Sequence, residues 1–175
     1  MTRSKWIPSP GGSMMPRMER GPPEQFGRYR LVRLLGEGGM AEVYLATVGV
    51  LQGLQKHVVI KKIRGDFAGD PDFTRMFVDE AKIALSLNHA NLVQVFDFGD
   101  VRGQLFLAME WVEGIDLMQL MRRLAAADTR MPAVIAAYLG HQVAAALSYA
   151  HQKRDDLGQP LAITHRDVSP HNIMV

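Results

Sequence analysis

The 175-residue sequence contains no cysteine. Disulfide bonds, thiolate metal sites and a cysteine nucleophile are therefore excluded, and we expect a protein of the reducing cytoplasm. The sequence also lacks an uninterrupted apolar run of the roughly 18–20 residues that a membrane span needs. The longest apolar stretch, residues 131–150, is broken by Gly140, His141, Gln142 and Ser148. We interpret it as a buried helix and expect no membrane span.

A strong charge of one sign is absent as well. The net charge is +2, and residues 1–27 account for all of it, with four basic side chains against two acidic ones. A nucleic-acid-binding surface needs lysine and arginine clustered within the folded part, which this distribution does not provide. We therefore expect no nucleic-acid partner. The hydrophobic fraction of 47% and the charged fraction of 22% are typical of a globular domain.

The distribution of prolines divides the chain. Residues 1–27 carry five of the nine prolines and show no apolar period, so we expect a disordered Pro/Gly-rich leader there. β-branched segments flanked by glycine turns predict strands first, and longer apolar-periodic segments predict helices later. The expected strands are 29–35, 42–48, 57–63, 91–98 and 104–111, and the expected helices are 70–87, 116–127 and 132–153. This order indicates an α+β protein with a sheet lobe in 28–113 and a helical lobe in 114–175.

A glycine-rich segment, Gly36-Glu37-Gly38-Gly39-Met40-Ala41-Glu42-Val43, lies between the first two expected strands. Glycines allow a backbone to approach phosphate groups closely and to direct N–H groups at them. The dinucleotide-binding fingerprint opens a helix, whereas this segment opens a strand, so that fold is excluded. An ordinary glycine-bearing hairpin remains the alternative.

One lysine is a candidate phosphate ligand. Lys61 ends the β-branched run Val58-Val59-Ile60, and alternation places it on the same face as Val59 and the neighbouring Lys62 on the other. Glu80 borders the apolar face of the helix expected at 70–87, which favours it over the adjacent Asp79 as a partly buried acid.

Residues 165–172 read His-Arg-Asp-Val-Ser-Pro-His-Asn. This string resembles the catalytic loop of eukaryotic-type protein kinases, and the glycine segment and the Val-Val-Ile-Lys run precede it in the family's order. The resemblance implies a protein-kinase-like fold with a five-stranded antiparallel N-terminal sheet. It also implies ATP and Mg²⁺ as cofactors, and γ-phosphoryl transfer to the Ser or Thr hydroxyl of a protein substrate. The Gly-Glu-Gly-Gly-Met loop and the Pro-rich leader suggest a bacterial serine/threonine kinase.

The resemblance also assigns roles to individual residues. Asp167 is the catalytic base, Asn172 is a magnesium ligand, and Lys61 binds phosphates while paired with Glu80. Asp116 binds the ribose or caps the next helix, two roles that the sequence leaves open. The residues that the resemblance assigns to nucleotide binding are Gly36, Glu37, Gly38, Gly39, Met40, Ala41, Val43, Val59, Lys61, Met109, Glu110, Val112, Asp116 and Met174.

Some residues depart from the family pattern. Asp97-Phe98-Gly99 spells the family's magnesium motif, but it precedes the catalytic loop, so we expect a strand end there rather than a metal ligand. Ser169 stands where serine/threonine kinases usually carry lysine, while Pro170 still favours that class over the tyrosine kinases.

The family's second magnesium-binding Asp follows the catalytic loop and is not among these residues. We therefore expect a kinase domain truncated after the catalytic loop, with little or no activity of its own and an exposed apolar helix at 132–153. The alternatives are a non-catalytic, pseudokinase-like fragment that binds a nucleotide or another protein, and a broken reading frame without a stable product.

Overall fold

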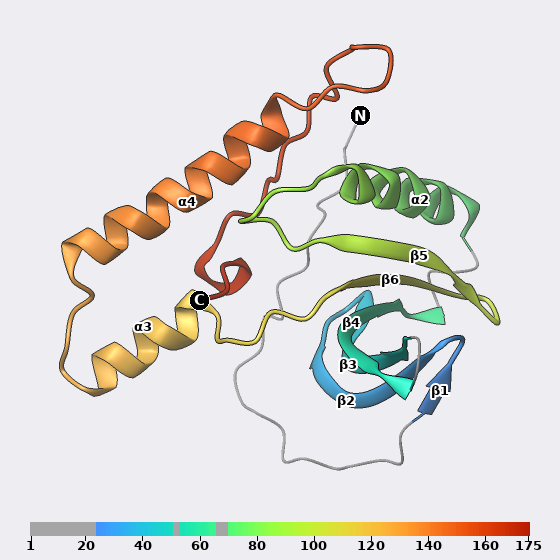
Figure 1. The fold of residues 1–175 in the computed structure, drawn as a ribbon, viewed down its shortest axis with the longest axis horizontal. Helices are drawn as coiled ribbons and strands as arrows, with labels where there is room; N and C mark the ends of the chain where they lie inside the picture. Colours follow the sequence, from blue (N-terminus) through green and yellow to red (C-terminus); the bar gives the residue numbers. More distant parts are fainter. Residues whose placement is uncertain (1–23, 51–52, 66–69) are drawn as a thin grey trace. The chain divides into compact units, whose positions relative to one another are not determined.

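The computed structural model of the protein describes residues 24–50, 53–65 and 70–175. The expected leader therefore lies outside the described residues up to position 23. The chain forms two units (Figure 1). One, here called the sheet unit, comprises the described residues up to Ser86 together with Gln94–Trp111. The other, here called the helical unit, comprises Leu87–Val93 and Val112–Val175.

The sheet unit holds an antiparallel sheet of six strands in the order β1-β2-β3-β4-β6-β5, and one helix. The α+β class with an antiparallel N-terminal sheet is confirmed. The elements are β1 (Glu24–Phe26), β2 (Tyr29–Glu37), β3 (Ala41–Gly49), β4 (Gln55–Ile63), α2 (Pro71–Ser86), β5 (Val95–Val101) and β6 (Gln104–Glu110).

The sheet has one strand more than the five expected. β1 lies in the last residues of the segment that we assigned to the leader, and its three residues are too few to show a period. Gly27, with φ 56°, turns the chain back onto β2. Phe26 is buried and meets the ring of Phe106 edge-on, with the ring centroids 5.5 Å apart. This apolar contact attaches β1 to the rest of the sheet.

The hairpin between β5 and β6 turns later than expected. Arg102 and Gly103 form the turn, with φ 56° and 80°, as a two-residue hairpin turn requires. Gly99 and Asp100, which we expected in the turn, therefore lie in β5. The strand expected at 91–98 starts only at Val95, because the residues before it belong to the helical unit.

One face of the sheet carries the core of this unit. Residues that face each other across paired strands share a side of the sheet, and their side chains pack together. The buried members of this cluster are Phe26, Tyr29, Leu31, Ala46, Val58, Ile60, Phe106 and Ala108. Figure 1 shows β1 to β4 as a strongly curled part of the sheet. The opposite face is thereby left for the functional side chains described below.

The helical unit contains α3 (Leu117–Ala126), α4 (Ala133–His151) and the short 3₁₀ helix η2 (Pro170–Asn172). Asp116 caps α3 by accepting a 2.7 Å hydrogen bond from the backbone of Gln119. Leu87–Val93 joins this unit through α4. The Asn88 backbone donates to the Tyr149 hydroxyl at 3.0 Å, and the Asn91 amide donates to the side chain of Gln142 at 2.7 Å.

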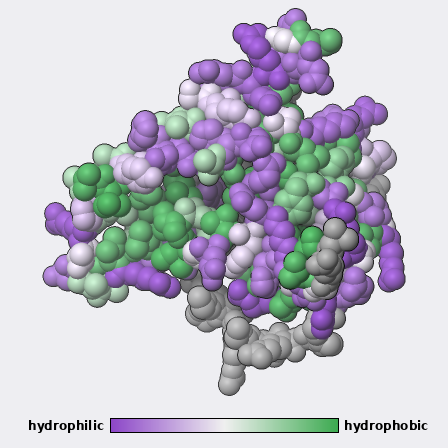
Figure 2. Space-filling model, viewed as in Figure 1, coloured by the Kyte–Doolittle hydropathy of each residue, from purple (hydrophilic) through white to green (hydrophobic). Residues whose placement is uncertain are grey.

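α4 is largely exposed among the described residues, as expected for the apolar helix at 132–153 of this chain; residues 131–150 are therefore not the buried helix that their composition alone indicates. Only its Ala146 and Ala150 are buried, while Val134 and Tyr138 are 72% and 58% exposed. Figure 2 shows hydrophobic side chains gathered over α3 and α4. α4 alone among the described helices is long and apolar enough to cross a membrane, a test that core helices of globular proteins also pass.

Candidate active site

The first part of the candidate site is a buried lysine on β4. The side chain of Lys61 is only 7% exposed. In the strand register it faces Val43 on one side and Leu107 on the other, and Gly36 of β2 faces Val43. Lys61 therefore lies in one row with the start of the glycine segment, on the face opposite the core cluster.

Burial governs the electrostatics of this lysine. Loss of hydration lowers the pKa of Lys61 from 10.5 to about 8, and the attraction of Glu80 on α2 opposes that shift. A buried ammonium group is costly unless an anion compensates it. Glu80 thus attracts the ammonium group of Lys61, while the ion pair that the resemblance implies stays a prediction. A further anion at this place would lower the cost of burying the lysine.

The neighbouring lysine is directed elsewhere, as strand alternation predicts. Lys62 forms a 3.1 Å ion pair with Glu42, and its ammonium lies 5.3 Å from the centre of the Tyr44 ring. These residues share the side of the sheet that carries the core cluster. Lys62 is thus separated by the sheet from the face of Lys61 and Val59.

The glycine segment forms the hairpin between β2 and β3, as expected. The Gly38 N–H donates to the Ala41 carbonyl at 2.8 Å and closes the turn. Met40 is 52% exposed, and no atom lies within 4 Å of where a Cβ of Gly39 would be. The tip of the loop is therefore open to a ligand.

Val59 and Met109, two further candidates for nucleotide binding, share the face of Lys61. Val59 is buried and faces Met109 of β6 across the sheet.

Glu110 ends β6, and its backbone N–H donates to the Gln94 carbonyl at 2.9 Å. Its carboxylate accepts the Gln94 N–H at 2.8 Å, a contact that sequence reasoning missed. This pair of bonds fixes the end of β6, just before Val112.

A second group of candidate residues lies in the helical unit, in the loop before η2. The Asn172 side-chain amide donates to the Asp167 carbonyl at 2.9 Å, and the Asn172 backbone donates to the Ser169 carbonyl at 3.0 Å. Arg166 has φ 63°, a left-handed conformation that is unusual for a residue with a side chain. The loop thus holds Asp167 and Asn172 together.

A short backbone ladder attaches this loop to the start of α3. Ile115 and Val175 exchange two N–H···O bonds of 3.0 and 2.9 Å, and Asp116 forms a bridge with Met174. Gly114 is required here, because a Cβ at this position would collide with the Val175 carbonyl oxygen. Asp116 and Met174 are therefore neighbours. The capping role of Asp116 is present, while its ribose role stays a prediction.

Ser169 has an unusual hydroxyl. Its Oγ is shielded from solvent and has no hydrogen-bond partner among the described residues. The residue caps η2 without a side-chain bond. Buried hydroxyls are normally paired, so this position is an unfavourable feature of the loop.

Asp97 has a structural role in the sheet. Its carboxylate accepts hydrogen bonds from the Tyr29 hydroxyl at 2.6 Å and from the Arg28 guanidinium at 2.8 Å. Burial and the bond to Asp97 raise the pKa of Tyr29 to about 12. The motif Asp97-Phe98-Gly99 thus lies within β5, rather than at its end, and ties β5 to the start of β2.

Comparison with known proteins identifies the family. The pattern of the protein kinase domain matches residues 29–175. This chain therefore belongs to the protein kinase family, in a form with bacterial relatives, and it represents only part of the kinase domain.

Two curated relatives illustrate this likeness. The tyrosine-protein kinase MasK of Myxococcus xanthus is 37% identical over 150 residues, covering 86% of this chain and 23% of that protein. The serine/threonine-protein kinase PrkC of Bacillus subtilis is 37% identical over 149 residues, covering 85% of this chain and 21% of that protein. The chain thus spans under a quarter of each relative's length.

A solved structure supports the same assignment. The kinase domain of PknI from Mycobacterium tuberculosis aligns with a TM-score of 0.66 and 34% identity. The alignment covers 86% of this chain and 56% of that domain. The sheet unit and the first helices are thus those of a protein kinase fold.

Proposed function

We propose that this chain is the nucleotide-binding part and catalytic loop of a serine/threonine protein kinase, which transfers the γ-phosphoryl group of Mg-ATP to a protein hydroxyl. The observation that carries the proposal is the buried cation of Lys61 on the face that continues into the glycine loop. A triphosphate is the kind of anion that compensates such a charge. Pro170 and the relatives named serine/threonine-protein kinases, such as PrkC, favour serine and threonine, whereas the relative MasK is named a tyrosine-protein kinase.

In the sheet unit, Lys61 would contact the α- and β-phosphates while Glu80 orients it. The loop from Gly36 to Ala41 would cover the phosphates with its backbone N–H groups. Val43, Val59 and Met109 would line the adenine side, because they share the face of Lys61. Val59 is larger than the alanine usual at its position, so we expect a tight adenine pocket.

The family resemblance assigns the remaining contacts to Glu110, at the end of β6, and to three residues of the helical unit. Glu110 and Val112 would pair with the adenine edge through backbone groups, Asp116 would meet the ribose, and Met174 would contact adenine. All four assignments rest on the family resemblance.

In the helical unit, Asp167 would accept the proton of the substrate hydroxyl, and Asn172 would hold a magnesium ion through its side-chain oxygen. The side-chain amide of Asn172 also donates to the Asp167 carbonyl, which keeps the two residues together in the loop. No group of three His, Asp or Glu side chains gathers among the described residues. Magnesium would therefore arrive with the nucleotide, and it supplies charge neutralisation when bound.

Nucleotide binding by the 175-residue chain tests the proposal. We expect ATP to bind with magnesium dependence, and Lys61→Met to weaken that binding at least tenfold. Lys56→Met, which removes an exposed lysine from the same strand, serves as the control and should leave affinity unchanged. Equal affinities of the wild-type chain and Lys61→Met would refute the role of Lys61. Binding without magnesium dependence would favour the non-catalytic alternative.

Transfer by these 175 residues alone is expected to be weak, because the family's second magnesium-binding Asp is not among them. Vigorous autophosphorylation that Asp167→Asn abolishes would overturn this expectation. We also place this part of the protein in the cytoplasm, where ATP is available.

A further inference from the structure

Four charged side chains meet at the base of the glycine loop. Glu37 at the end of β2 faces Glu42 of β3 in the strand register, which opposes two like charges. Each acid is paired with a base from β4 or from the residue just after it. Lys62 lies 3.1 Å from Glu42, and Arg64 lies 3.1 Å from Glu37.

Arg64 holds the glycine loop on both sides of its tip. Its backbone N–H donates to the Met40 carbonyl at 3.0 Å, just after the glycines. Its guanidinium reaches past β3 to Glu37, just before Gly38. The residue thus joins the two ends of the segment that would cover the phosphates.

The ion pair lies on the side of the sheet away from Lys61. Glu37 and Glu42 form the row next to that of Gly36, Val43 and Lys61, and adjacent rows point to opposite faces. Arg64 follows the end of β4, and its guanidinium reaches the Glu37 carboxylate on the face of this row. Its guanidinium is therefore directed away from the face of Lys61, and any influence on a nucleotide passes through the loop.

We propose that Arg64 is a positioning residue, whose ion pair with Glu37 holds the glycine loop in its binding conformation. This inference rests on the proposed function, because it assumes that the loop binds nucleotide phosphates. A loop that is already ordered loses less conformational entropy when it binds. Arg64 and Glu37 are 41% and 53% exposed, so the effect is salt-sensitive and changes affinity by up to about fivefold.

A different role would be simple charge neutralisation. If Arg64 only cancelled the repulsion between Glu37 and the phosphates, Glu37→Gln would leave affinity unchanged or raise it. If the pair positions the loop, Glu37→Gln and Arg64→Gln weaken binding to a similar extent, and the double variant is no worse than either. Glu37→Gln therefore separates the two explanations.

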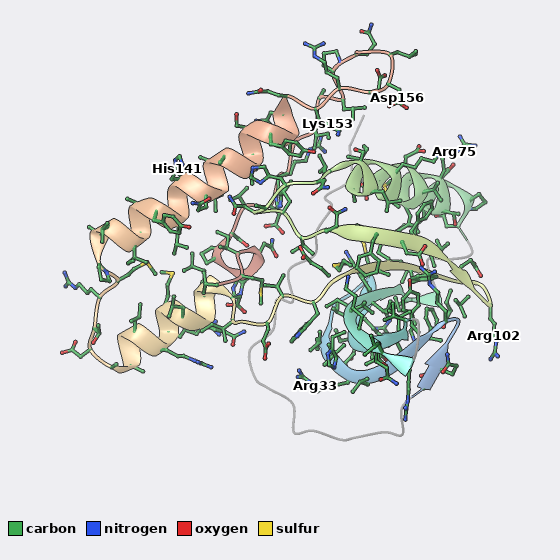
Figure 3. All side chains as sticks on the ribbon, in the orientation of Figure 1. Arg33, Arg75, Arg102, His141, Lys153 and Asp156 are labelled. Carbon is green, nitrogen blue, oxygen red and sulfur yellow. The ribbon has the colours of Figure 1, made fainter. Side chains whose placement is uncertain are left out.

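The experiment uses the 175-residue chain with two readouts. The first is the affinity for Mg-ATP at low and high salt. The second is hydrogen exchange of the Gly38 amide without nucleotide, because the bond from Gly38 to the Ala41 carbonyl reports loop closure. The control is Arg33→Gln, which removes an exposed arginine from β2. Figure 3 shows Arg33 at the outer side of the sheet unit.

We expect each single variant to bind Mg-ATP about threefold more weakly and to exchange the Gly38 amide about threefold faster. The exchanged pair Glu37→Arg with Arg64→Glu should restore both values, because the two side chains still carry opposite charges and the new arginine at position 37 faces Glu42. Failure of this rescue, or unchanged exchange in the single variants, would overturn the proposal. If the wild-type chain binds no ATP, the proposed function fails, and the exchange data still decide the role of the pair.

Discussion

Replacement of Lys61 by methionine should change how the stability of the protein depends on pH. The folded state lowers the pKa of this lysine from 10.5 to about 8, chiefly through burial. Between these values the unfolded chain binds more protons than the folded one, so stability rises as the pH rises from about 8 to about 10.5. The rise is absent from Lys61→Met, which has no ammonium group to discharge.

The magnitude follows from the size of the shift. The difference between 10.5 and about 8, at about 1.4 kcal/mol per pKa unit, gives a burial cost of roughly 3 kcal/mol at neutral pH. Lys61→Met should therefore be the more stable protein at pH 7, by at most this amount. The gain is smaller to the extent that Glu80 loses a favourable partner, since its attraction raises the pKa of Lys61.

Two tyrosines act in the opposite direction at the alkaline end. Burial raises the pKa of both Tyr29 and Tyr44 from 10.0 to about 12. Their stabilising contribution is complete below pH 10 and is lost as the pH rises towards 12. Both tyrosines are present in the wild-type chain and in Lys61→Met, so their effect cancels in the difference between the two proteins.

The assay is urea unfolding of the two proteins from pH 7 to 10.5, followed by circular dichroism. We expect the stability of the wild type to rise by about 3 kcal/mol relative to that of Lys61→Met over this range. Lys56→Met controls for the loss of a lysine from β4, and its difference from the wild type should stay flat. A flat difference for Lys61→Met as well would refute the claim that the ammonium group is held in a costly environment.

Three other substitutions probe the packing around the site. Gly114→Ala should lower the free energy of unfolding by about 1–3 kcal/mol, because its methyl group would collide with the Val175 carbonyl. The melting temperature should fall accordingly, and an unchanged melting curve would contradict this. Ser169→Ala should leave the unfolding free energy unchanged or raise it by up to about 1 kcal/mol, and a loss in denaturant titration would show that the hydroxyl has a partner. Asp97→Asn should lower the pKa of Tyr29 in an ultraviolet titration, because Asp97 helps to raise it; no change would mean that burial alone sets it.

The elements that the sequence predicts best are those whose side chains alternate on a half-buried sheet. β4 shows this most clearly, because the faces of Lys61 and Lys62 follow directly from their order in the strand. α3 was predicted to within a residue, since Asp116 supplies a cap whose signal is local. In these cases the forces that decide the structure act within a few residues of the chain.

Predictions failed where distant residues decide the structure. β1 is held by the contact between Phe26 and Phe106, which lie far apart in the sequence, and nothing local marks it as a strand. The composition of residues 131–150 alone indicated a buried helix, and only the expected absence of its partners among these residues indicated that α4 is exposed. The start of β5 depends on the bonds that hold Leu87–Val93 to α4.

The candidate site contains both kinds of residue. The resemblance to the kinase motifs was enough to nominate Lys61, Asp167 and Asn172, because each motif is a short run of residues that can be recognised locally. Arg64 has no such signature, since its ion pair depends on how β2, β3 and β4 lie side by side. Residues that touch a ligand are constrained by chemistry common to a family, whereas residues that position a loop are constrained by packing. The second kind therefore has to be found in the fold, and the exchanged Glu37–Arg64 pair tests whether packing of this kind controls the loop.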